Sequence, residues 1–164
     1  MKTPIFVAIA ATALAVPATA HAEPTPSCSN GQVQVSNGGE HRGLGHRDVI
    51  LTFSLSPGTA ACTLTGYPGV DSGAGGPLVH AERTLTGYMG GIRGSDTPRT
   101  ITVSESQPAY AVVEGVAVDA QDPYRVCPTY TDLRVTPPDT TETVTVPIHF
   151  DTCPLEVHPV GSEM

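Results

Sequence analysis

The sequence has 164 residues, of which 39% are hydrophobic and 15% are charged, and its formal net charge is −8. This length suits one ordinary globular domain with a sizeable core. Sixteen acidic residues face only eight basic ones. This balance disfavours nucleic acid and anionic membrane surfaces as partners, because both attract positively charged proteins.

The N-terminus has the pattern of a cleavable export signal. Lys2 provides a positive charge, Ile5–Val16 is almost entirely apolar, and Ala20–Ala22 fits the small-x-small pattern read by signal peptidase. The apolar stretch is shorter than the roughly 20 residues that span a bilayer. We therefore predict a signal peptide over residues 1–22 and one mature domain over residues 23–164, secreted to the extracellular space or associated with the cell envelope, with no transmembrane segment in the mature chain.

Four cysteines remain after the predicted cleavage, at positions 28, 62, 127 and 153. An even number in an exported protein indicates disulfides, of which three pairings are conceivable. We favour Cys28 with Cys62 and Cys127 with Cys153, because this pairing places an independent crosslink in each half. Each closed loop would stabilise the fold by roughly 3–4 kcal/mol in the chain-entropy description. A structural metal site would need closely spaced cysteine pairs, which the sequence lacks.

Short apolar alternations separated by turn residues run through the whole mature region, and no long segment keeps a helical period. This pattern predicts an all-β, two-sheet antiparallel sandwich held by disulfides. Short strands are also expected near Thr63 and Leu155. The longer candidate strands are Gln32–Ser36, Asp48–Leu55, Leu78–Thr84, Thr100–Ser104, Ala109–Val118, Asp132–Thr136 and Thr143–Phe150.

Glycine-rich segments at Ser72–Pro77 and Met89–Asp96 are predicted to be mobile loops. Neither begins a helix, so neither provides the helix N-terminus that phosphate-binding loops use. Pro68-Gly69 suits a tight turn after the strand that begins at Cys62.

The segment Cys62-Thr-Leu-Thr-Gly-Tyr-Pro68 resembles a segment of the secreted actinobacterial family catalogued as domain of unknown function 4232. Further landmarks of that family follow in order along the chain. The resemblance implies an immunoglobulin-like sandwich and a mycobacterium-like source, and the family carries no established activity. The matching landmarks are Cys28, Gln107–Glu114, Cys127, Leu133–Pro138 and Cys153.

The segment Val70–Leu78 is similar to the serine-protease signature Gly-Asp-Ser-Gly-Gly-Pro, but the supporting residues are missing. No histidine follows Ala61, and Ala74 is inserted in the turn that would form the oxyanion hole. The absence of tryptophan also leaves few aromatic side chains to hold a sugar ring. We therefore predict no catalytic residues and no cofactor, with an unrecognised hydrolase as a remote alternative.

The segment around Cys127 offers the residue types that dominate binding hot spots, namely Tyr124, Arg125 and Tyr130. We predict a non-enzymatic binding module that uses this recognition patch for an unknown envelope or extracellular partner. In the alternative arrangement, both tyrosine rings would pack over the cystine.

A second functional alternative is a weak metal or small-ligand carrier. His41 and His46 share a glycine- and arginine-rich segment with Glu40 and Asp48, which we expect to be a loop. The pairs formed by His80 with Glu82 and by His149 with Asp151 are explained by exposed polar strand faces, so we predict no dedicated metal site.

Overall fold

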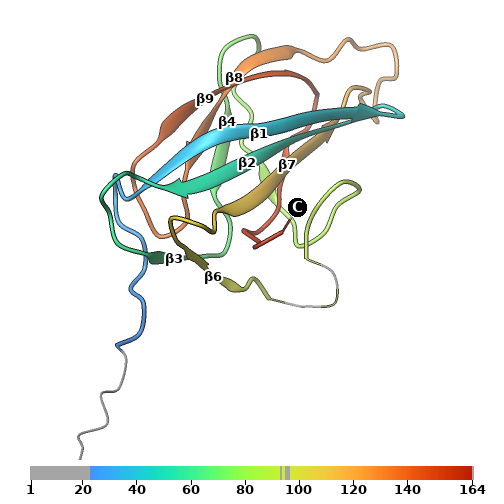
Figure 1. Ribbon diagram of the computed structural model, residues 1–164. Helices are drawn as coiled ribbons and strands as arrows, with labels where there is room; N and C mark the ends of the chain where they lie inside the picture. Colours follow the sequence, from blue (N-terminus) through green and yellow to red (C-terminus); the bar gives the residue numbers. More distant parts are fainter. Residues whose placement is uncertain (1–22, 93, 95–96, 164) are drawn as a thin grey trace, which may run out of the picture.

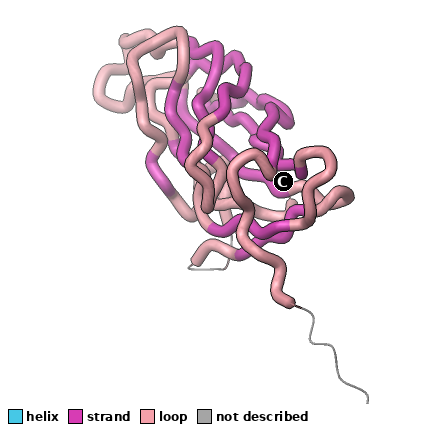
Figure 2. The backbone as a smooth tube through the Cα atoms, turned by 90° about the vertical axis from the view of Figure 1, so that its left-hand side faces the viewer, coloured by secondary structure: helices cyan, strands magenta, loops and turns pink. Residues whose placement is uncertain are grey.

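The computed structural model describes residues 23–92, 94 and 97–163, so the predicted signal peptide lies outside the described residues. The described residues form strands, turns and loops without a helix, as Figure 2 shows. No helix among them is therefore long and apolar enough to cross a membrane. The all-β class predicted from the sequence is confirmed.

Ten strands are present in the described residues. The longest pair with their neighbours over most of their length. Their bounds are β1 Val33–Gly43, β2 His46–Leu55, β3 Cys62–Thr65, β4 Gly69–Ser72, β5 Glu82–Arg83, β6 Thr100–Val103, β7 Ala109–Val116, β8 Thr129–Thr136, β9 Val144–Asp151 and β10 Glu156–Val157.

The strands form two main layers (Figure 1). One layer is a five-stranded sheet in the order β1-β2-β7-β10-β5, and the other is a three-stranded sheet in the order β4-β8-β9. Strands β3 and β6 form a separate two-stranded sheet. All pairs are antiparallel except β10 with β5. This is the disulfide-stapled sandwich that the sequence predicts.

The core forms between the two layers because apolar side chains alternate with polar ones along their strands. On β9, Val146, Ile148 and Phe150 are buried, whereas the intervening positions are exposed. Leu51 and Phe53 of β2 belong to the same buried cluster. Full burial of each such side chain contributes about 1.5–3 kcal/mol before conformational entropy is counted.

Both disulfides have the sequential pairing favoured above. Cys28 is bonded to Cys62 and Cys127 to Cys153, with sequence separations of 34 and 26 residues. The first crosslink attaches the chain preceding β1 to the start of β3. The second attaches the start of β8 to the segment between β9 and β10.

The two layers are also joined along both sides. On one side, the backbone of Val79 and Ala81 hydrogen-bonds to β4, and the chain then continues into β5 of the other sheet. On the opposite side, β1 covers the free edge of β9 with side chains. Asn37 Nδ2 donates to Pro147 O at 3.2 Å, and the backbone N of His149 donates to Glu40 Oε1 at 2.9 Å. These contacts leave less of the β9 edge open to pairing with another chain.

Strand bounds differ most from the prediction in three places. The first strand does not end at Ser36 but continues to Gly43 after a bulge between Asn37 and Gly39. The outer half of β1 lacks an apolar alternation because its side chains contact the polar edge of β9, so its sequence has the composition of a loop. Of the predicted strand Leu78–Thr84, only Glu82–Arg83 is a strand, β5.

The third difference is β4, Gly69–Ser72, a strand that the sequence did not predict and that begins at the glycine of the expected Pro68-Gly69 turn. The glycine-rich residues that follow it form a loop held against β8. Thr131 N donates to Ala74 O at 2.9 Å, and a Cβ at Gly75 would lie 2.1 Å from Thr129 O. The glycines here therefore allow close packing, and the prediction of a loose loop does not describe these contacts.

Candidate recognition surface

The hairpin between β1 and β2 ends in an unusual two-residue turn. Leu44 and Gly45 both have positive φ, 49° and 84°. A turn with two left-handed residues matches the twist of a β-hairpin and ordinarily takes Asn-Gly or Gly-Gly. Leucine is strained in this conformation, and this leucine also exposes 92% of its surface. The turn therefore presents a large apolar side chain where a small polar residue would be more stable.

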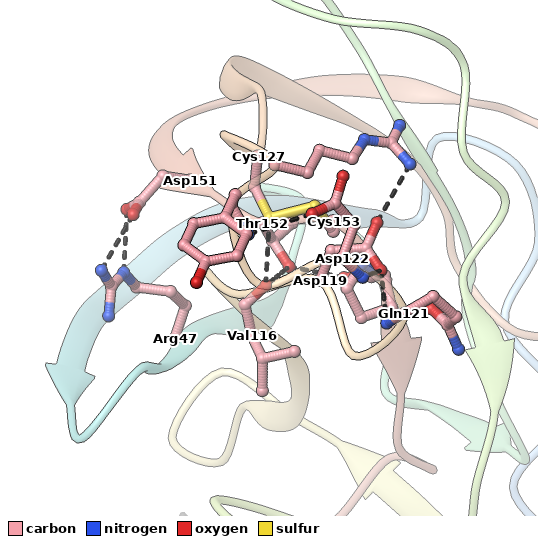
Figure 3. Close-up of a disulfide and its surroundings, with 12 residues drawn as sticks. Arg47, Val116, Asp119, Gln121, Asp122, Cys127, Asp151, Thr152 and Cys153 are labelled. Carbon is pink, nitrogen blue, oxygen red and sulfur yellow. Dashed lines mark hydrogen bonds and ion pairs between the residues drawn. A yellow bond between two sulfur atoms is a disulfide. The ribbon is translucent and has the colours of Figure 1, made fainter.

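A second turn, from Val118 to Val126, projects beyond the end of β7. Its base is closed by an antiparallel bridge between Val118 and Val126. Within it, the carboxylate of Asp119 accepts hydrogen bonds from the backbone N of Gln121 at 2.9 Å and of Asp122 at 3.3 Å (Figure 3). Arg125 Nη1 donates to the other carboxylate oxygen of Asp119 at 3.0 Å.

The charge of Asp119 strengthens this arrangement. The hydrogen bond from the Gln121 backbone, followed by that from Asp122 and the nearby Arg125 guanidinium, holds the pKa of Asp119 below its usual value. The carboxylate is thus ionised at neutral pH and accepts all three hydrogen bonds. The turn has a defined shape although almost none of it lies in regular secondary structure.

The Cys127–Cys153 disulfide lies directly at the base of this turn (Figure 3). The backbone N of Cys153 donates to Val116 O at 3.1 Å, and Thr152 Oγ1 donates to the same oxygen at 3.2 Å. The disulfide and these hydrogen bonds hold the end of β7 against the segment that follows β9.

The two turns lie at the same end of the sandwich (Figure 1). Ala117 N donates to Gly45 O at 2.9 Å, which joins the hairpin tip to the start of the second turn. Four large apolar side chains are displayed here, and we call them the apical patch. They are Leu44, Val118, Tyr124 and Val126, with exposed fractions of 92%, 50%, 94% and 90%.

A pocket with a volume of about 380 Å³ opens beside the second turn. This volume is within the range of about 300–1,000 Å³ typical of ligand pockets and large enough for one or two side chains of a partner. Its wall is mainly apolar, and the turn contributes the polar atoms. The lining includes Pro77, Val79, Pro128, Pro154, Asp119 and Arg125.

The structure places the three predicted recognition residues in different environments. Tyr124 is almost fully exposed, and the side chain of Arg125 is 58% exposed while bonded to Asp119. Tyr130 is wholly buried, and its hydroxyl donates to Pro77 O at 3.0 Å. The expectation that Tyr130 is exposed is therefore wrong, because β8 turns this ring inward, where it lines the pocket beside the second turn.

His41 and His46 lie on β1 and β2, so the expected loop is a hairpin. The ring of His41 contacts Asp48 with Nδ1 2.8 Å from Oδ2, whereas the ring of His46 stacks on Tyr88 with centroids 3.8 Å apart. Within the described ranges, no group of three or more histidine, cysteine, aspartate or glutamate side chains is placed to hold a metal ion.

The protease-like segment has a structural use. Ser72 is buried, its Oγ donates to Pro77 O at 3.0 Å, and it accepts a hydrogen bond from Val79 N at 2.8 Å. Both bonds close the turn after β4. The neighbouring pair Asp71 and His80 is exposed, with Oδ1 and Nδ1 2.6 Å apart. Successive strand residues point to opposite faces, so the Ser72 hydroxyl faces away from this pair.

Sequence reasoning missed Leu44, Val118 and Val126 as candidate residues. Leu44 carried a usable signal, because a leucine between two glycines at a hairpin tip has no local core to enter. The two valines carried none, since each continues the alternation of a strand. Only the closure of the turn by the Val118–Val126 bridge places them beyond the sheet.

The fold and the displayed turns define a disulfide-stapled, all-β sandwich with a candidate binding surface at one end. Residues 28–162 match the profile of the family described as domain of unknown function (DUF4232), and the chain belongs to this family. The match confirms the family predicted from the Cys62–Pro68 segment. No curated protein and no solved structure matches the chain.

Proposed function

We propose that this chain is a secreted or cell-envelope-associated, non-enzymatic binding module that recognises a protein partner through the apical patch. The observation that carries the proposal is the exposure of four large apolar side chains on two connected turns. Exposed apolar side chains gathered at one place are uncommon on a monomer surface unless they contact a partner. Here one of them also occupies a strained backbone conformation.

The rigidity of the patch supports recognition. The Asp119 hydrogen bonds, the Gly45–Ala117 contact and the Cys127–Cys153 disulfide fix the turns before a partner arrives. A surface that is already ordered loses less conformational entropy on binding. The adjacent pocket would accept one apolar side chain of the partner, with Arg125 and Asp119 at its polar side.

Charge favours a protein over an anionic membrane as the partner. The chain has a formal net charge of −8, and loss of Lys2 with the predicted signal would make it −9. Asp119 and Asp122 adjoin Tyr124 within the same turn, with Arg125 as the nearby cation. An anionic lipid surface would be repelled by this arrangement. The two disulfides support an oxidising compartment outside the cytosol.

A photo-crosslinking experiment tests the proposal. A photoreactive benzophenone amino acid replaces Tyr124 in one protein and Glu105 in a control, because Glu105 is also exposed but precedes β7, whereas the second turn follows β7. Each protein is irradiated with a cell-envelope fraction from the source organism, and crosslinked proteins are identified by mass spectrometry. The Tyr124 probe should capture a protein that the Glu105 probe does not, and added unlabelled wild-type protein should compete for it.

Substitutions in the apical patch provide a second test in the same crosslinking experiment. Leu44→Ser should reduce capture at position 124, whereas Glu105→Ser should leave it unchanged. Equal capture by the two probes, or capture that unlabelled protein fails to compete, would count against the proposal. Capture of lipid but no protein would contradict the proposal of a protein partner and would indicate binding to a membrane.

A further inference from the structure

The loop Leu85–Ile92 lies over the outer face of the five-stranded sheet and is held there by one buried carboxylate. Glu114 on β7 is only 6% exposed. Its Oε1 accepts a hydrogen bond from Tyr88 N at 2.8 Å, and its Oε2 accepts one from Met89 N at 2.6 Å. Both carboxylate oxygens thus accept a hydrogen bond from the loop backbone, the arrangement for which an ionised carboxylate is the stronger acceptor.

Glycines let this loop approach the sheet closely. A Cβ at Gly87 would lie 1.8 Å from Glu114 Oε1, and a Cβ at Gly90 would lie 2.8 Å from the Cδ2 atom of His158. The ring of Tyr88 stacks on His46 of β2 at the edge of the loop. The loop therefore covers Glu114 and His158, which are 6% and 1% exposed.

The hydrogen bonds of His158 determine which nitrogen carries a proton. The residue is 1% exposed, and its Nδ1 lies 3.0 Å from Thr84 O and 3.1 Å from Thr84 Oγ1. A carbonyl oxygen only accepts, so Nδ1 must donate and must be protonated. In a neutral imidazole, the second nitrogen, Nε2, would then be an acceptor without a proton.

That second nitrogen faces the carboxylate. Nε2 of His158 is 3.4 Å from Glu114 Oε2, and it is buried without a satisfactory hydrogen-bond partner. A neutral ring would place two acceptors, Nε2 and Oε2, against each other in a buried position. A proton on Nε2 removes the conflict and turns the contact into a buried ion pair.

We propose that His158 and Glu114 form a buried proton-binding site, in which a proton taken from solvent resides on His158 Nε2 and fastens the loop Leu85–Ile92 to the sheet. Protonation of the imidazole breaks no covalent bond and needs no other reactant. Loss of the proton leaves Glu114 facing an acceptor and weakens its hold on the Tyr88 and Met89 amides. The loop is thereby coupled to pH.

The charged groups around the site reinforce proton uptake. A row of side chains crosses the same face of the sheet at paired register positions, and four of its five members are acidic. The carboxylates on both sides of Glu114 increase the negative potential at His158, while the His41 ring contacts the far side of the row through Asp48. The row runs His41, Asp48, Glu114, Glu156 and Glu82 across β1, β2, β7, β10 and β5.

The neighbouring acids are less well satisfied than Glu114. Asp48 is 3% exposed, and its Oδ1 is buried without a hydrogen-bond partner. Glu156 accepts a hydrogen bond from Thr84 Oγ1 at 3.5 Å. Two buried carboxylates at paired positions of β2 and β7 repel each other. An imidazolium at His158, with Nε2 3.4 Å from Glu114 Oε2, offsets the charge of Glu114 and reduces that repulsion.

The experiment is a ¹⁵N nuclear magnetic resonance measurement of the histidine rings in the whole mature protein. At pH 7, both nitrogens of His158 should carry a proton, and the exposed His149 provides a reference ring in the same sample. As the pH is raised, the backbone amide signals of Tyr88 and Met89 should shift together with the loss of the Nε2 proton. An unprotonated Nε2 at pH 7 would overturn the proposal.

Variants separate proton binding from a purely structural contact. Glu114→Gln should remove the Nε2 proton at pH 7 and speed amide exchange at Tyr88 and Met89 by about tenfold or more. Glu156→Gln, which leaves the Glu114–His158 contact in place, should keep the Nε2 proton. If the wild-type amides of the loop do not respond when Nε2 loses its proton, the coupling to the loop is refuted, even should Glu114→Gln fail to fold.

Discussion

Arg47 on β2 and Asp151 at the end of β9 form a two-pronged ion pair that joins the two layers of the sandwich. Arg47 Nε donates to Asp151 Oδ1 and Arg47 Nη2 to Asp151 Oδ2, both at 2.8 Å (Figure 3). Arg42 Nη1 lies 3.1 Å from the same carboxylate. The Arg47 hydrogen bonds are the main reason why the pKa of Asp151 is lowered. Planar donors matched to a carboxylate give stronger contacts than a single lysine would.

Replacing Arg47 with glutamine should lower the free energy of unfolding by about 1–2 kcal/mol at pH 7, since the side chains are only partly exposed. An aspartate with a lowered folded-state pKa stabilises the fold above its unfolded pKa, near 3.9. The difference between wild type and variant should therefore shrink as pH falls below about 4 and Asp151 becomes protonated in both. Urea unfolding at several pH values measures this difference.

Arg99→Gln is the control, because Arg99 is exposed and has no ion pair in the described residues. A difference that stays constant between pH 7 and pH 3 would contradict the assignment.

The two disulfides should have similar effects on stability but different effects on the apical patch. Their sequence separations of 34 and 26 residues imply losses of about 3–4 kcal/mol each when the cysteine pair is replaced by serine. Only removal of Cys127–Cys153 should speed amide exchange across residues 118–126, because that bond lies at the base of the turn. Hydrogen exchange with mass spectrometry tests this, with the Cys28/Cys62 double variant as the matched control. Equal exchange in the two variants would show that the turn does not depend on its crosslink.

Tyr130 and Tyr124 provide a test of burial with the same chemical change. Tyr130→Phe removes a buried hydroxyl that donates to Pro77 O and should cost about 1 kcal/mol. Tyr124→Phe changes an exposed ring and should alter stability by less than about 0.5 kcal/mol. Denaturant unfolding of both variants gives the comparison. Similar losses in both would mean that Tyr124 packs against the protein in solution.

This pair also shows where sequence reasoning stops. Both tyrosines flank Cys127 at three residues' distance, so their local contexts are alike. Tyr130 is buried because it lies on β8, where pairing with Phe150 sets its face, and the register shifts at the next residues. Tyr124 lies in a turn closed by Asp119. Whether a tyrosine here lies on the recognition surface or in the core therefore depends on strand register, and the pattern of a single sequence does not give that register.

Strands with an apolar face, β2 and β9 among them, were predictable from the sequence, but the burial of the outer face of β2 was not. On β9 the alternation is continuous, and its predicted bounds differ from the structure by one residue at each end. On β2, positions 48–51 are all buried, including Asp48, because the loop Leu85–Ile92 and its neighbours cover the outer face. Nothing within the β2 sequence indicates a cover contributed by a loop about 40 residues later. The burial of Glu114 and His158 was hidden for the same reason.

The hairpin tip makes the most direct prediction about function, because stability and recognition should move in opposite directions there. Leu44 has a φ of 49° and precedes Gly45 in a turn that favours Asn-Gly. Leu44→Asn should therefore raise the free energy of unfolding by about 0.5–1 kcal/mol, since asparagine tolerates the left-handed region far better.

The same change removes an exposed apolar side chain from the apical patch and should weaken crosslinking from position 124. Leu78→Asn is the control for stability, because Leu78 is exposed without a positive φ and should show no gain. A gain in stability with undiminished crosslinking would exclude Leu44 from the recognition surface. A loss of stability would show that the leucine makes a contact in solution that offsets its strain. The predicted combination, a more stable protein that binds less well, is the pattern expected where a sequence retains a strained residue for its contact with a partner.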